Sequence, residues 1–155
     1  MKHILYSILI IFFIPNCTLN KVINQHGVNF LEKKQAKISV NKSNTNDIIE
    51  FLGPPSTKST FDNDMWIYIE RVTSSSKITK LGKKDLIKNN VLILEINNKG
   101  ILSQKIFIDK EKMNNLEFSE EFIKMSLTKK SFIYDFLSSM RRKINDPLGK
   151  KSKNN

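Results

Sequence analysis

Residues 43–70 constrain the fold most, because they contain a capped helix, a helix stop, a turn and an aromatic strand within one short stretch. Ser43 or Asn44 can cap the helix, and Asp47 lies near its positive end. The apolar residues of the helix fall on one stripe: Ile48, Ile49, Phe51 and Leu52. Gly53 supplies a left-handed position after the helix, and the pair Pro54-Pro55 prevents its continuation. The stretch therefore predicts a short amphipathic helix that begins after its cap at Ser43 or Asn44, ends before Gly53 and has one buried side.

After a turn at residues 62–64, residues 65–72 have the β-branched and aromatic composition of a strand. Alternation places Met65, Ile67 and Ile69 on one face, which we expect to pack against the helices. Trp66 and Tyr68 then point to the opposite face. We predict that both residues, together with Phe61 near the turn, face a binding partner. The alternative is that a C-terminal helix folds back and buries Phe61 and Trp66.

The remaining elements are read from shorter patterns. Residues 31–38 predict a first helix, although residues 38–40 could also run extended. Residues 91–96 and 101–108 predict a hairpin around a turn that ends in Gly100. Residues 73–90 read as a long, disordered loop. The predicted fold is therefore α+β: two short N-terminal helices packed on a three-stranded antiparallel meander, in the order ααβββ, plus a C-terminal amphipathic helix.

That C-terminal helix follows an irregular polar segment, with both lying in residues 109–146. Its stripe is formed by Phe132, Ile133, Phe136, Leu137, Met140 and Ile144. Thr128 or Ser131 could cap it, and Pro147 ends it ahead of a disordered basic tail at residues 147–155. The helix either packs on the domain, or it binds in a partner's groove or on a membrane surface.

The N-terminus predicts export. Residues 4–14 are almost entirely apolar, and eleven helical residues rise about 16 Å, which suits a signal peptide and is too short for a membrane span. We predict a signal peptide at residues 1–16, lipid attachment at Cys17 and a polar tether at residues 17–30. Ile14-Pro15-Asn16 departs from the usual residues before a lipidated cysteine, which leaves a plain secretory leader as the alternative. However, an exported chain with one cysteine has no disulfide partner for it, and lipidation accounts for that residue.

Several classes of function find no support in the sequence. The formal net charge of +11 comes mostly from lysines, and no nucleic-acid-binding signature accompanies it. His26 has no second histidine or free cysteine beside it, so we predict a local hydrogen-bonding role and no metal site. No nucleophile–base set and no phosphate-binding glycine loop can be assembled, so we expect neither an enzyme nor a small-molecule substrate.

The ordered set Leu52, Gly53, Pro55, Thr60, Phe61, Asp62, Asn63, Trp66 and Tyr68 resembles the SmpA/OmlA lipoproteins, the BamE component of the outer-membrane β-barrel assembly machinery. Residues 22–27 resemble the start of the alphaproteobacterial members. The resemblance covers residues 17–108, and more loosely the chain to Leu137, with a BamE-like domain at residues 31–108. Asp47, Leu52, Gly53 and Pro55 would then be its structural motif.

The resemblance implies a non-enzymatic lipoprotein subunit that supports insertion of β-barrel proteins and envelope integrity. The expected partners are the central barrel protein, its lipoproteins and membrane lipid. Thr18 after the cysteine favours the outer membrane, with the chain anchored at its periplasmic face. The lipid on Cys17 is the only covalent group expected, with no other cofactor. The alternative is a stand-alone periplasmic protein-binding or inhibitor module, or a cell-wall-associated lipoprotein.

Overall fold

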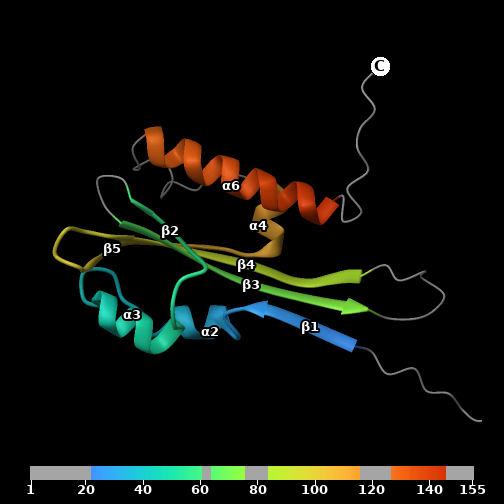
Figure 1. Cartoon of the computed structure of the whole chain (residues 1–155), viewed down its shortest axis with the longest axis horizontal. Helices are drawn as coiled ribbons and strands as arrows, with labels where there is room; N and C mark the ends of the chain where they lie inside the picture. Colours follow the sequence, from blue (N-terminus) through green and yellow to red (C-terminus); the bar gives the residue numbers. More distant parts are fainter. Residues whose placement is uncertain (1–21, 61–63, 76–83, 116–126, 146–155) are drawn as a thin grey trace, which may run out of the picture.

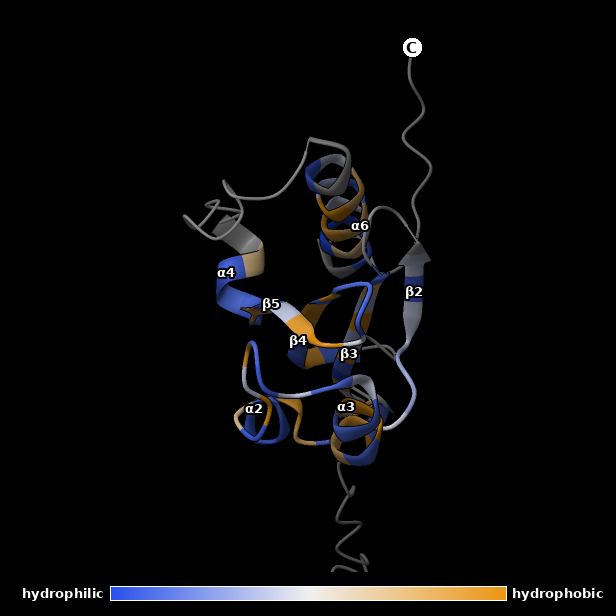
Figure 2. Ribbon diagram, turned by 90° about the vertical axis from the view of Figure 1, so that its left-hand side faces the viewer, coloured by the Kyte–Doolittle hydropathy of each residue, from blue (hydrophilic) through white to orange (hydrophobic). Residues whose placement is uncertain are grey.

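A five-stranded antiparallel sheet lies between two layers of helices in the computed structural model, which describes residues 22–60, 64–75, 84–115 and 127–145 (Figure 1). Figure 2 views the layers end-on, with α6 (Leu127–Asn145) on one side of the sheet. The helices α2 (Leu31–Gln35) and α3 (Thr45–Leu52) lie on the other side. The short helix α4 (Lys110–Asn115) follows the last strand on the α6 side.

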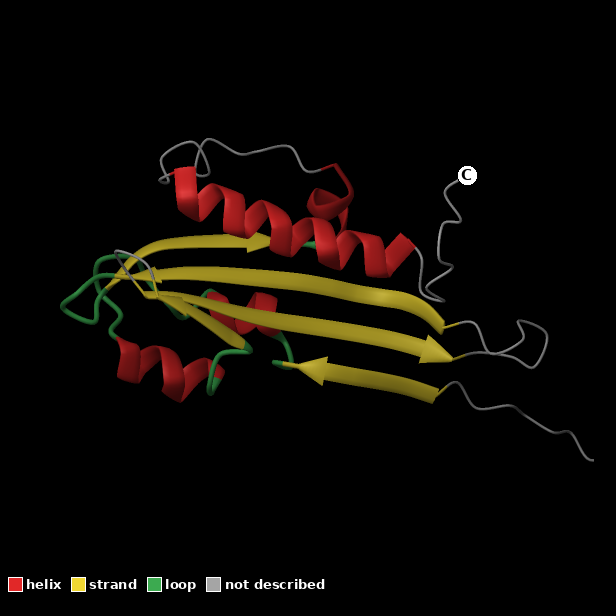
Figure 3. Ribbon diagram, turned by 45° about the horizontal axis from the view of Figure 1, so that its top comes forward, coloured by secondary structure: helices red, strands yellow, loops and turns green. Residues whose placement is uncertain are grey.

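The strands are β1 (Val22–Gly27), β2 (Thr57–Thr60), β3 (Asp64–Ser75), β4 (Lys84–Ile96) and β5 (Leu102–Ile108). Their order is β1-β3-β4-β5, and β2 also pairs with β3. β2 pairs with the first residues of β3, and β1 pairs with the last residues of β3. Both β1 and β2 therefore lie along the edge of β3 opposite β4. Figure 3 shows these strands running between the helix layers. The predicted hairpin is confirmed, because β4 pairs with β5 across the turn at Gly100, whose φ is 76°.

Both faces of the sheet are apolar, and each is covered by its own helices. The first core, which we call the α6 core, contains Met65 and Ile67 of β3 together with Ile133 and Leu137 of α6. The second, the helix-pair core, contains Trp66 and Tyr68 of β3, and apolar residues of α2, α3 and the segment between them. Side chains alternate between the two cores along β3, as the period of a strand requires.

The helix α3 forms where the sequence predicts it. Asn44 Oδ1 accepts hydrogen bonds from the backbone N–H groups of Asn46 (2.8 Å) and Asp47 (3.1 Å). In return, the carboxylate of Asp47 accepts from Asn44 N–H (2.9 Å), which completes a capping box. The helix ends at Leu52, and Gly53 follows with a φ of 78° and a ψ of −167°. The predicted cap and stop are confirmed.

The predicted fold class, a three-stranded meander behind two N-terminal helices, is wrong. The sheet has five strands, and β1 lies within residues predicted to be a tether. Most of residues 73–90 predicted to be a loop belong to β3 and β4, with residues 76–83 outside the described residues. β1 carries polar residues and is exposed along most of its length, so backbone hydrogen bonds to β3 hold it without an apolar pattern. Such a strand leaves no periodic signal.

The predicted assignment of the two faces of β3 is also wrong. α2 and α3 cover the face of Trp66 and Tyr68, whereas α6 covers the face of Met65 and Ile67. The helix α6 begins at Leu127, ahead of the predicted start, which places Ser131 inside the helix instead of at its cap. Alternation shows which residues share a face, but when both faces are apolar it does not show which helix covers each one.

Some predictions fall on residues outside the described ranges: the signal peptide, Cys17, Phe61 and the tail beyond residue 145. Within the described ranges, every helix is too short or too polar to cross a membrane.

Candidate functional site

Trp66, which the sequence assigns to a partner-facing surface, is a core residue. Its side chain is 4% exposed and packs among the residues of the helix-pair core. The ammonium of Lys58 on β2 lies 4.1 Å from the centroid of the indole ring, so a cation covers part of the ring from the neighbouring strand. Trp66 therefore joins β2, β3 and the helices, and its assignment to an open surface is corrected.

Tyr68 is fully buried in the same core, which corrects its assignment as well. Its hydroxyl donates a hydrogen bond to the carbonyl oxygen of Gly53 (3.0 Å), directly after the end of α3. Burial raises the pKa of Tyr68 because the phenolate would be poorly solvated there. The hydrogen bond fixes the end of α3 to the middle of β3.

The residues predicted as a structural motif surround this contact. Gly53 N–H donates to Ile49 O (2.8 Å), and its φ and ψ lie in a region that is nearly restricted to glycine. Leu52 is buried in the helix-pair core, and Asp47 completes the cap at the other end of α3. Pro55 is half-buried after the helix stop. These residues position α3, and none of them presents a reactive group.

The surface feature that stands out is the connection between β1 and α2. Phe30, at the start of α2, is 61% exposed and has a φ of 58° and a ψ of 40°. A left-handed backbone is uncommon for a bulky residue, costs roughly 1–2 kcal/mol and persists only where neighbouring contacts enforce it. Leu31, the next residue, is fully buried. The chain therefore exposes one aromatic side chain directly beside a core position.

A buried carboxylate holds this connection in place. Glu70 on β3 is 1% exposed, and its Oε1 accepts a hydrogen bond from Phe30 N–H (3.0 Å). Its Oε2 accepts from Nδ2 of the buried Asn90 on β4 (2.9 Å). Both carboxylate oxygens are thus occupied by neutral donors, as a buried polar group requires. Glu70 links two central strands to the backbone of Phe30.

Gly27, the last residue of β1, lies at the start of the connection to α2. Its φ is 81°, and a Cβ at this position would overlap the carbonyl oxygen of Ile69. The close approach allows Val28 N–H to donate to that same carbonyl (2.8 Å). We call the set Gly27, Val28, Phe30, Glu70 and Asn90 the Phe30 junction.

Sequence reasoning missed the Phe30 junction. Alternation along the strand puts Glu70 on the same face as Trp66 and Tyr68, and Phe30 falls within the predicted tether at residues 17–30. The available signal was a single carboxylate, Glu70, in an otherwise apolar and aromatic part of the strand, because such a residue needs buried hydrogen-bond donors if the strand is central.

His26 lies exposed on β1, opposite Arg71 in the register of β3. Among the described residues, no three His, Cys, Asp or Glu side chains gather in a way that could hold a metal ion.

The part of the chain that matches a known protein family coincides with the helices and strands that carry these residues. The profile of the family described as "Outer membrane protein assembly factor BamE domain" matches residues 28–105, half of the chain. The chain belongs to the BamE family. The family prediction is therefore confirmed, and the BamE domain contains α2, α3, β2, β3, β4 and most of the Phe30 junction. β1, α4 and α6 lie outside the matched residues, so the α6 core uses elements beyond the BamE domain. Comparison with curated proteins and with solved structures gave no match.

Proposed function

We propose that this chain is a non-enzymatic lipoprotein subunit of the outer-membrane β-barrel assembly machinery and that Phe30 docks on another protein of that complex. The match to an outer-membrane protein assembly factor carries the first part of the proposal. The exposed and firmly held Phe30 supports the second part.

The Phe30 junction has the physical properties of a docking anchor. A large aromatic side chain that enters a partner's pocket contributes on the order of 2 kcal/mol or more to binding. The hydrogen bond from Phe30 N–H to Glu70 and the buried Leu31 fix the backbone on both sides of the ring's attachment point. Ordering on association then costs little, because the backbone is already fixed before the partner arrives.

The proposed anchor is lipid on Cys17, at the outer membrane and facing the periplasm. The support is the apolar leader that ends at the single cysteine of the chain. Attachment to the same membrane as the barrel protein would raise the effective concentration of each for the other. An individual contact such as Phe30 can then be modest and still contribute to a stable complex.

The test compares two exposed aromatic residues on opposite sides of the sheet. Phe30→Ala removes the aromatic side chain that we propose docks on the partner protein. Tyr134→Ala removes the side chain of Tyr134 on α6, which is 46% exposed. Tagged full-length chains are purified from membranes in mild detergent, and the co-purifying barrel protein is quantified. A loss of about 2 kcal/mol corresponds to about 30-fold weaker association for Phe30→Ala.

The stability of both variants is measured on the same samples. We expect Phe30→Ala to change the free energy of unfolding by less than about 0.5 kcal/mol, because its side chain is mostly exposed. Tyr134→Ala should recover as much barrel protein as the original chain. Equal recovery with both variants would refute the role of Phe30. Recovery of a soluble periplasmic protein in place of the barrel protein would refute the assembly role itself.

A further inference from the structure

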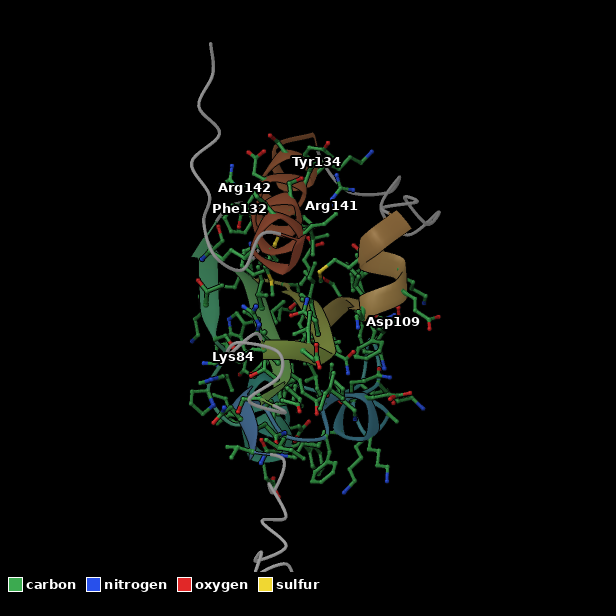
Figure 4. The ribbon with its side chains drawn as sticks, turned by 90° about the vertical axis from the view of Figure 1, so that its right-hand side faces the viewer. Lys84, Asp109, Phe132, Tyr134, Arg141 and Arg142 are labelled. Carbon is green, nitrogen blue, oxygen red and sulfur yellow. The ribbon has the colours of Figure 1, made fainter. Side chains whose placement is uncertain are left out.

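The strand β1 lies at the margin of the sheet. It is the first strand in the order β1-β3-β4-β5, and five of its six residues are exposed. Figure 3 shows β1 outside β3, and Figure 4 shows it on the far side of the sheet from Tyr134 and Arg142 of α6. Among the described strands, only β3 pairs with β1. These strands therefore leave one side of the β1 backbone open, and we call this side the β1 edge.

The register identifies which backbone groups belong to the β1 edge. Val28 N–H donates a hydrogen bond to Ile69 O (2.8 Å), so Ile69 directs its backbone groups toward the β1 side of β3. Because this direction alternates along an antiparallel strand, positions 71, 73 and 75 do the same, and they pair with positions 26, 24 and 22. The N–H and C=O groups of Ile23 and Gln25 consequently point away from the sheet.

Other margins of the sheet carry features that protect an exposed edge. At the start of β5, Asn41 N–H donates to Leu102 O (2.8 Å) and Leu102 N–H donates to Ser43 O (2.9 Å), so the segment between α2 and α3 pairs there. β2 has only four residues and includes Lys58. Short strands and lysines disfavour pairing with another chain. The six residues of β1 contain no Lys, Arg, Asp, Glu or Pro, and they pair with β3 without a bulge.

The β1 edge continues into the Phe30 junction. Phe30 follows Gly27, the last residue of β1, by three positions, so its 61% exposed side chain is attached within about 11 Å of the end of the strand. The exposed apolar residues Val22 and Ile23 lie at the other end of β1. A chain that pairs with β1 therefore meets apolar side chains at both ends of the edge.

The chemistry of the β1 edge favours an extended and uncharged strand as its occupant. The formal net charge of +11 opposes pairing with a second copy of this chain. Backbone groups bind any extended chain, and the side chains of β1 offer no fixed charge to select one. Strands of outer-membrane barrels alternate polar and apolar residues, and their backbone groups need partners until the barrel closes. Such strands fit this edge.

We propose that the β1 edge binds an extended strand of an unfolded β-barrel protein, the client of the assembly machinery, by strand addition. The inference rests on the proposed function and names the substrate class that the subunit contacts. The N–H groups of Ile23 and Gln25 donate to the client backbone, and their C=O groups accept from it. So few hydrogen bonds bind weakly and reversibly, as release of the client requires.

The test measures binding of a strand-forming peptide to the purified full-length chain by fluorescence anisotropy. The labelled peptide has about ten residues and blocked ends, and valine or tyrosine alternates with threonine or serine along it. It carries no charge, so the charge of the protein does not drive its binding. The control peptide is N-methylated at two adjacent central residues, which removes a donor from each of its edges. We expect the control to bind at least about tenfold more weakly.

Two substitutions of Gln25 test the edge itself. Gln25→Pro removes the outward N–H, and a proline is tolerated on an edge strand where the N–H faces solvent. It should weaken binding of the unmethylated peptide by at least about tenfold. Gln25→Ala keeps the N–H and is the matched control, with an expected change of less than about twofold.

Amide hydrogen exchange, measured by NMR, locates the peptide. In the original chain, the peptide should slow exchange at Ile23 and Gln25 and leave Tyr134 unchanged. The amides of Asn24 and His26 face β3, so they should remain as protected in Gln25→Pro as in the original chain, which shows that β1 is still in place. If Gln25→Pro releases β1, the comparison of the two peptides on the original chain decides the question.

Equal binding of the two peptides, or slowed exchange only at residues outside β1, would overturn the proposal. A dimer in sedimentation that Gln25→Pro converts to a monomer would assign the β1 edge to a second copy and overturn it as well. A chain that recovers the barrel protein in detergent and does not bind the peptide would overturn this inference alone. Recovery of a soluble periplasmic protein in place of the barrel protein would refute the proposed function, and the client would fail as the occupant even if the peptide bound.

Discussion

Replacement of Gly27 by alanine tests whether β1 and the Phe30 junction are held as the structure shows. The added methyl group would overlap the carbonyl oxygen of Ile69, which belongs to the central strand β3 and cannot move away without disturbing the sheet. The φ of 81° adds strain, because residues with a Cβ avoid this region. Both effects act on the same residue.

The expected loss of stability follows from these two contributions. A left-handed backbone costs alanine about 1–2 kcal/mol. To relieve the overlap, β1 must shift, and the hydrogen bond from Val28 N–H to Ile69 O is then lost at a net cost of about 1 kcal/mol. Gly27→Ala should therefore lower the free energy of unfolding by about 2–3 kcal/mol.

The matched control is Gly53→Ala. Gly53 has a similar φ of 78°, but apart from its two chain neighbours no residue has an atom within 4 Å of the position that its Cβ would occupy. Only backbone strain remains there, so we expect a loss of about 1–2 kcal/mol. Urea denaturation of both variants gives the two free energies, and amide hydrogen exchange reports whether β1 opens separately from the rest of the sheet. A loss below about 0.5 kcal/mol for Gly27→Ala, with β1 still protected, would refute the reasoning.

Three further predictions concern the two cores and the helix cap. Tyr68→Phe should reduce the loss of stability at alkaline pH. The buried Tyr68 keeps its proton above its usual pKa of 10.0 while the same residue ionises in the unfolded chain, so the free energy of unfolding falls as pH rises above that value, and urea denaturation at neutral and alkaline pH measures the slope. Leu137→Ala should lower the free energy of unfolding by about 2–5 kcal/mol, because Leu137 is buried between α6 and the sheet; a thermal melt unchanged from the original would mean that α6 does not pack there. Asn44→Ala should cost about 1 kcal/mol through the lost cap of α3, and hydrogen exchange at Asp47 N–H should accelerate; undiminished protection would argue against the cap.

The sequence predicts well those features that depend on neighbouring residues. Asn44 and Asp47 form their capping box within one turn, and Gly53 ends the same helix, so no distant contact is needed to predict them. The turn at Gly100 follows from the residues between two β-branched runs for the same reason.

The features that failed depend on residues far apart in sequence. β1 is an exposed and largely polar edge strand, so its pairing with β3 is specified by backbone groups and by Gly27, without an alternating apolar pattern. The sequence predicts an open face for Trp66 and Tyr68 because the chain carries apolar residues on both sides of β3, and only the tertiary structure shows that each side has its own helices. The role of Glu70 was equally hidden, since Phe30 lies 40 residues before it.

The central claim is that this BamE-family chain contacts the barrel assembly complex through the Phe30 junction. The most direct measurement is photo-crosslinking in intact cells, with a photoreactive amino acid in place of Phe30 and, separately, in place of Tyr134, followed by mass spectrometry of the crosslinked products. Crosslinks from position 30, and none from position 134, to a protein subunit of the assembly complex are the predicted result. Crosslinks from position 30 only to lipid, to a soluble periplasmic protein or to the cell wall would contradict the account.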